Sequence, residues 1–182
     1  MAVSKLWSIN EGGLSRVLQY AANPKKTNNK LYISGINCEP ETAYEEFTAV
    51  KRSYAKADGI EAYHGYLSFK EQNITPELTM KIGTEFAQEV WGKRFQVLVT
   101  VHTDTEHSHC HFVINSVSFV DGKKLWGEEK VWFKFKQTAD RLCEKYGLYY
   151  NPKPVRGRSS SYHYNREKEG EPTRYLLARE AM

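Results

Sequence analysis

The chain has 182 residues, of which 40% are hydrophobic, so it is long enough for one domain with a core of its own. It contains no run of about eighteen apolar residues, and its first residues, MAVSKLWSINEGG, lack the apolar core of a signal peptide. The net charge of +4 is mild and fits nucleic-acid binders as well as many other proteins. We therefore expect a cytoplasmic protein without a membrane segment.

The N-terminal half alternates strand and helix patterns. Residues 4–9 and 30–36 are predicted to be strands. Residues 14–22 are predicted to form a short helix, because their apolar side chains fall on one stripe and the following NPKK ends it. Acidic residues early and basic residues late in 39–57 favour a second helix.

The next part of the chain carries stronger signals. Residues 61–69 are predicted to be a strand, and 75–92 a helix with a Thr cap, a Pro at its first position and a terminal Gly. Residues 94–102 and 109–120 are predicted strands joined by a short polar turn, and 131–147 is the last predicted helix. This order predicts an α+β fold, a mainly antiparallel sheet with helices packed on its faces.

The last residues differ in composition from the rest. Residues 151–182 contain seven basic residues and four glutamates, and they are rich in Pro, Gly and Ser. We therefore divide the chain into a domain over residues 1–150 and a basic tail or linker over 151–182. The final TRYLLAREAM consists of helix-forming residues, which fits a chain cut from a longer protein. The three cysteines are far apart and form no CxxC pair, so we expect reduced thiols: Cys38, Cys110 and Cys143.

Four of the six histidines lie within ten residues: His102, His107, His109 and His111. Side chains alternate along a strand, so the last three point the same way. If the two strands pair as a hairpin with His102 opposite His109, their Cβ atoms lie about 4.5–5.5 Å apart, and His111 is a diagonal neighbour. Three imidazoles then converge on one point.

Neutral imidazole is the commonest protein ligand for metal ions, and three of them leave positions open for substrate or water. We predict His102, His109 and His111 as ligands and place His107 outside them, where the polar turn enters the strand. Three imidazoles suit Mn, Zn, Ni or Co, and we expect Mn or Mg in use. The alternative is a solvated turn without an ion. A metal site alone leaves hydrolysis, oxygen chemistry and phosphoryl transfer open.

The segment HTDTEHSHCHFVIN has the pattern HxDxxHxHxHxxxN. It resembles the third motif of relaxases, the mobilisation nucleases of conjugative elements, in the P-type (MobP) class of the two-histidine (HUH) endonuclease superfamily. YISGINCEPETAYEEF, AYHGYLSF and WGKRFQVLVTVH stand in the expected order, so the resemblance covers roughly residues 3–150. It implies a sandwich with a five-stranded antiparallel sheet, a metal cluster at its centre and a tyrosine on a nearby helix.

The resemblance also implies a reaction, that of a conjugative relaxase, a metal-dependent endonuclease and strand transferase. LSRVLQYAANPKKT resembles the first relaxase motif, whose tyrosine corresponds to Tyr20. Its oxygen would attack a phosphodiester at an origin of transfer, giving a 5′-phosphotyrosyl link that can be rejoined later. A divalent ion would polarise the phosphate oxygens. The implied partners are single-stranded or hairpin-bearing origin-of-transfer DNA and other conjugation proteins, in a bacterial cytoplasm.

Asp104 has two open roles. A tyrosine with its usual pKa of about 10 needs activation, which Asp104 could supply. A carboxylate beside a metal-bound imidazole more often fixes its tautomer, here that of His102. His64 could reach the cluster if its strand is adjacent, although a lone strand histidine is more often structural.

Candidate DNA contacts are basic or polar residues near the cluster or in the tail: Lys25, Lys26, His107, Asn115, Lys123, Lys124, Arg156 and Arg158. Two other functions remain open. A rolling-circle replication or transposition initiator of the same fold usually carries its tyrosine after the histidine motif, and candidates lie there: Tyr146, Tyr149 and Tyr150. The other is a non-catalytic DNA-binding module.

Overall fold

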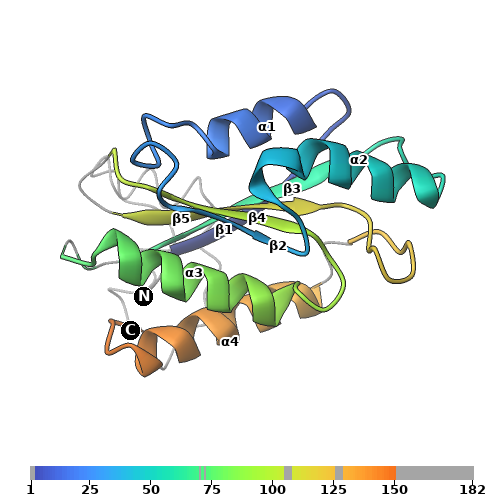
Figure 1. Cartoon of the computed structure of the whole chain (residues 1–182). Helices are drawn as coiled ribbons and strands as arrows, with labels where there is room; N and C mark the ends of the chain where they lie inside the picture. The colour runs from blue at the N-terminus through green and yellow to red at the C-terminus, as the bar shows by residue number, and fades with distance from the viewer. Residues whose placement is uncertain (1–2, 70, 72, 105–107, 126–128, 151–182) are drawn as a thin grey trace, which may run out of the picture. The chain divides into compact units, whose positions relative to one another are not determined.

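A five-stranded antiparallel sheet separates two pairs of helices in this computed structural model, which describes residues 3–69, 71, 73–104, 108–125 and 129–150 (Figure 1). The strands lie in the order β1-β3-β5-β4-β2, and every neighbouring pair is antiparallel. Their bounds are β1 Val3–Ile9, β2 Ile33–Ile36, β3 Ala62–Ser68, β4 Val97–His102 and β5 His109–Asn115. The α+β prediction and the five-stranded sheet are confirmed.

The larger core lies between one face of the sheet and the helices α3 (Pro76–Val90) and α4 (Glu129–Lys145) (Figure 1). At its centre Phe86, Phe112 and Phe135 pack together, with the rings of Phe86 and Phe135 4.8 Å apart in edge-to-face geometry. Helix α3 begins as predicted, because the Thr75 side chain accepts a hydrogen bond from the Leu78 backbone N–H at 3.2 Å.

The opposite face is covered by α1 (Leu14–Ala21) and α2 (Ala43–Ser53), with the short turn η1 (Pro40–Thr42) before α2. A smaller core joins these helices to the sheet: Leu14, Val17, Leu18, Ala21, Ala43, Phe47, Ala62, Leu98 and Val113. Helix α2 is shorter than the predicted 39–57. It ends at Ser53 because Ala55 takes a left-handed φ of 52° and the Lys56 N–H closes the end by donating to the Lys51 carbonyl.

The register of the central strands sets the positions of the histidines. In the β4–β5 hairpin His102 stands opposite His109, as predicted, and Thr100 stands opposite His111. On the other side of β5, Tyr66 of β3 stands opposite His111. Cys110, between the two β5 histidines, is fully buried in the larger core on the other face, so the predicted alternation is confirmed.

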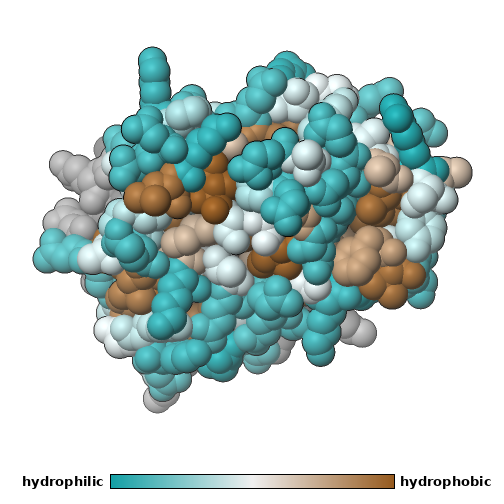
Figure 2. Space-filling model, in the orientation of Figure 1, coloured by the Kyte–Doolittle hydropathy of each residue, from teal (hydrophilic) through white to brown (hydrophobic). Residues whose placement is uncertain are grey.

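Hydrophilic residues cover most of the face seen in Figure 2, and hydrophobic residues form separate patches among them. In the described part of the chain, no helix has both the length and the apolar character that a membrane span requires. Residues 151–182 lie outside the described residues, so the predicted division between domain and tail stays a prediction.

Candidate active site

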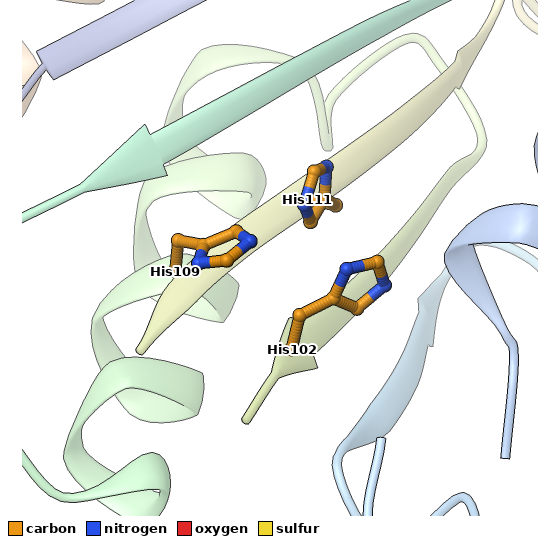
Figure 3. Close-up of side chains that lie close together, drawn as sticks. All are labelled: His102, His109 and His111. Carbon is orange, nitrogen blue, oxygen red and sulfur yellow. The ribbon is translucent and has the colours of Figure 1, made fainter. Parts of the chain in front are cut away.

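Three histidine side chains from β4 and β5 gather on the face that carries α1 (Figure 3). The nitrogen atoms that His102, His109 and His111 can offer to an ion all lie within 4.8 Å of one another. Burial lowers the pKa of His102, and burial, followed by the repulsion that a protonated His102 would exert, lowers the pKa of His111 to about 2. These two imidazoles therefore stay neutral, which is the form that binds a metal ion.

The hydrogen bonds of the rings show which nitrogen atoms are available. His102 Nε2 lies 2.9 Å from the carbonyl oxygen of Ala21, so it must donate a proton, and His111 Nδ1 lies 3.0 Å from His64 Nε2. The other two nitrogens, His102 Nδ1 and His111 Nε2, are buried without a hydrogen-bond partner among the described residues. Buried polar atoms are rarely left unpaired. A divalent cation at this point would satisfy both, so the residues present fit a metal ion.

His64, from β3, lies at the edge of this cluster. Its ring stacks on that of His111 with centres 5.1 Å apart. Burial lowers the pKa of His64 to about 4, with a smaller contribution from the charge of His102, so His64 is neutral and can accept the proton of His111 Nδ1. Sequence reasoning favoured a merely structural histidine here. The pairing of β3 with β5 places His64 where its Nε2 can accept a hydrogen bond from His111 Nδ1.

Tyr20 lies over the three-histidine cluster. Its ring centre is 5.5 Å from that of His102 and 5.9 Å from those of His64 and His111, and the residue is 45% exposed. It occupies the last turn of α1, directly before Ala21, whose carbonyl binds His102. The helix end and the cluster are therefore joined, and Tyr20 stands between the cluster and solvent.

Asp104 pairs with Lys26 rather than with a histidine. The Lys26 ammonium lies 3.0 Å from Asp104 Oδ2 and 4.9 Å from the centre of the Tyr20 ring. The hydrogen bond to Asp104 raises the pKa of Lys26, so Lys26 stays protonated and positively charged. The role of orienting His102, one of the two expected for Asp104, falls to the Ala21 carbonyl.

Asn115 is a correction among the expected DNA contacts. It shares the strand face of His111, as expected, but it lies at the other end of β5 and is fully buried. Its amide donates to the Phe47 carbonyl at 3.2 Å and to Gln96 Oε1 at 2.9 Å. Asn115 therefore links α2 to the sheet and cannot touch DNA in this conformation.

The other expected contacts are spread along the domain. Lys25 is exposed, in the loop after α1 that also supplies Lys26. Lys123 and Lys124 follow the far end of β5, about 20 Å from the cluster for a strand of this length. Lys123 pairs with Asp121, and Lys124 donates to the Asp58 carbonyl. Three further candidates lie outside the described residues: His107, Arg156 and Arg158.

The later tyrosines follow α4. Tyr146 and Tyr150 pack against the larger core, on the face of the sheet opposite the histidines. Their hydroxyls are held by the carboxylates of Glu85 at 2.7 Å and Glu144 at 2.8 Å. These hydrogen bonds raise the pKa of both tyrosines, which opposes their use as nucleophiles. Tyr149, between them, is exposed.

An antiparallel sheet that carries a histidine cluster beneath a tyrosine at a helix end is the arrangement of the two-histidine nuclease class. A family model described as the relaxase MobA/VirD2-like nuclease domain matches residues 20–148. The chain belongs to this relaxase family.

Two relatives show how much of a longer protein this chain covers. A protein rlx of Staphylococcus aureus is 37% identical over 148 residues, which are 81% of this chain and 44% of that protein. The group II intron-interrupted relaxase LtrB of Lactococcus lactis subsp. cremoris is 25% identical over 179 residues, covering 76% of this chain and 31% of its own length. The chain thus spans less than half of these relatives.

Solved structures support the fold. The MobM relaxase domain, bound to plasmid pMV158 oriT DNA with Mn, superposes with a TM-score of 0.61 at 12% identity. The match covers 91% of this chain and 98% of that domain. At this identity the likeness speaks for the fold alone.

Proposed function

We propose that this chain is the nicking and joining domain of a conjugative DNA relaxase. The observation that carries the proposal is the solvent-accessible Tyr20 directly above three converging imidazoles, two of which, His102 and His111, are buried. Membership of the relaxase family and the relatives named relaxases support it. The MobM domain, which was solved with Mn and oriT DNA, supports both the metal and the kind of substrate.

The chain's own residues supply the nucleophile and its surroundings. Tyr20 Oη attacks the phosphorus of a DNA phosphodiester and forms a P–O bond, while the bond to the 3′ oxygen breaks and that oxygen leaves with the electron pair and takes up a proton. The 5′-phosphotyrosyl ester keeps the energy of the broken bond, so the reverse attack can rejoin the strand. A divalent ion bound by His102, His109 and His111, expected to be Mn or Mg in use, would polarise the non-bridging phosphate oxygens.

The Tyr20 hydroxyl must lose its proton during attack, and Lys26 is placed to help. Its ammonium lies 4.9 Å from the ring centre, where it can stabilise the negative charge that develops on the reacting oxygens during the attack. Asp104 then acts through Lys26, by fixing the ammonium over the ring. Lys26 also offers a positive charge to the incoming phosphate. Asp104 is therefore a positioning residue in this proposal.

The test is the covalent adduct. The full chain is incubated with Mn²⁺ and a pool of randomised single-stranded oligonucleotides, and any protein–DNA adduct is isolated and sequenced. Mass spectrometry of the adduct is expected to find the nucleotide on Tyr20. Tyr20→Phe is expected to retain metal and DNA binding and to form no adduct, since it lacks only the attacking oxygen.

Other outcomes would favour the alternatives. An adduct on Tyr146, Tyr149 or Tyr150 would support the replication or transposition initiator, although the hydrogen bonds that hold the hydroxyls of Tyr146 and Tyr150 argue against it. DNA binding without any adduct would support the non-catalytic module. We also propose that the protein works with other conjugation proteins and acts in the bacterial cytoplasm.

A further inference from the structure

A groove of about 720 Å³ leads from the candidate active site toward the edge strand β1. Its volume is in the range of pockets that hold small ligands. Part of its wall belongs to the site described above: Tyr20, His64 and His111. The rest comes from β1, β3, α1 and the turn between β1 and α1, and includes Trp7, Tyr66 and Arg16. The groove thus extends the reaction centre into a region to which the nicking chemistry gives no role.

The aromatic side chains of Trp7 and Tyr66 both line this groove. Trp7 stands opposite His64 in the β1–β3 register, and its ring centre is 4.5 Å from that of His64 and 6.2 Å from that of Tyr66. Trp7 is nevertheless 39% exposed. An indole left in water has apolar area that a flat ligand could cover. His64 connects this ring to the nucleophile, because its own ring is 5.9 Å from that of Tyr20.

The charges around the groove favour an anionic ligand. Arg16 lines the groove, and the exposed Lys5 stands opposite Tyr66 on the strand face that carries Trp7. Glu11, in the turn between β1 and α1, also lines the groove and would repel a phosphate. With Lys5 counted beside the groove, two positive charges face one carboxylate, which favours the binding of DNA phosphates.

We infer that this Trp7 groove, lined by Trp7, Tyr66, Arg16, Tyr20 and His64, holds the unpaired nucleobase next to the attacked phosphate, with the base stacked on Trp7. The inference rests on the proposed function, because the strand attacked by Tyr20 is the one that fills the groove. Inside a duplex the faces of a base are covered by its neighbours, so only an unpaired base can stack on the indole. Every base has such a face, so the groove fixes the position of the strand without reading its sequence.

The test is a double-mutant cycle that combines one substitution in the protein with one change in the DNA. The oligonucleotide recovered as an adduct is made again with an abasic site on either side of the nicked phosphate. Affinities are measured by fluorescence anisotropy in a Tyr20→Phe background, which prevents cleavage. Trp7→Ala on intact DNA, and the abasic site at one of the two positions on unchanged Trp7, are each expected to weaken binding about tenfold, a typical loss for one stacked base. Combined, they are expected to cost no more than either change alone.

The controls separate the possible failures. Trp7→Phe keeps a flat ring and is expected to retain most of the affinity. Tyr44→Ala removes a 47% exposed aromatic residue of α2 outside the groove and is expected to change nothing. The abasic DNA needs no change at Trp7, so a folding defect of Trp7→Ala cannot hide the result. If the two losses multiply to about a hundredfold when the changes are combined, the inference is wrong while the proposed function still stands. The absence of an adduct with every member of the pool would overturn the proposed function as well.

Discussion

His102 joins the three-histidine cluster to the helix that carries Tyr20. One nitrogen of its ring donates to the Ala21 carbonyl, which is one of the carbonyls at the end of α1 that have no partner within the helix. That hydrogen bond leaves Nδ1 directed to the cluster as a lone-pair donor. The tautomer of His102 and the position of Tyr20 are therefore set by the same contact.

The ligand assignment predicts a clear pattern of metal loss. Alanine at His102, His109 or His111 is expected to remove bound metal and nicking together, because each change deletes one of three ligands. His107→Ala is the matched control, a histidine of the same segment that is expected to keep the metal stoichiometry. Calorimetric titration with Mn²⁺ measures both. A filled site in His102→Ala together with an empty one in His107→Ala would refute the assignment.

His64 predicts a weaker effect on the same site. His64→Ala removes the acceptor for His111 Nδ1–H, and loss of such a supporting hydrogen bond typically lowers metal affinity about 10- to 100-fold. His64→Gln offers a carbonyl acceptor and is expected to restore part of the affinity. A Mn²⁺ dissociation constant unchanged in His64→Ala would show that His111 needs no such support.

At the scale of elements, α1 is held at both ends by the sheet. Its N-terminus has no side-chain cap within the helix, but Glu61, just before β3, accepts from the N–H groups of Gly13 at 3.0 Å and Leu14 at 2.8 Å. Its C-terminus is bound by His102. The short helix that carries Tyr20 is therefore fixed from residues far away in the sequence.

Removing the Glu61 carboxylate is expected to destabilise the domain by about 1 kcal/mol, as loss of a helix cap does. Glu61→Ala should also slow nicking more than it weakens DNA binding, because Tyr20 is then less well held. Denaturant unfolding and single-turnover nicking give the two numbers. Glu11→Ala, a carboxylate in the turn before α1, is the control for stability. Equal stability of both variants would show that the cap contributes nothing.

The sequence was most informative where a local pattern decides the structure. The hairpin register followed from alternation and a short turn, and α3 followed from its cap and proline. The sequence alone could not identify contacts between residues that are far apart along the chain. Alternation gave Asn115 the correct face but not the helix α2 that buries it. It could not show that β3 brings His64 beside His111, or that β1 brings Trp7 beside His64.

Across the whole molecule, the distribution of basic residues predicts how DNA binding responds to salt. Affinity for the recovered oligonucleotide is expected to fall steeply with salt, with a slope of about 0.7 for each neutralised phosphate. Lys25→Ala, in the loop after α1, should reduce the slope by about one such step. Lys123→Ala, at the far end of β5, reports whether the strand reaches that end as well. An affinity independent of salt would exclude a phosphate-binding track.

The two faces of the sheet bury cores of different size. The aromatic rings of Phe86, Phe112 and Phe135 lie with α3 and α4, whereas α1 and α2 cover a small, mostly aliphatic core. We expect amide hydrogens of α1 to exchange with deuterium sooner than those of α3, since local opening on the thinner side exposes less apolar area. Substitutions on the α1 side should then alter how the strand is held while the thicker side keeps the domain folded. If one side of the sheet holds the DNA strand and the other keeps the domain folded, the preferred nick site could change between mobile elements with little loss of stability.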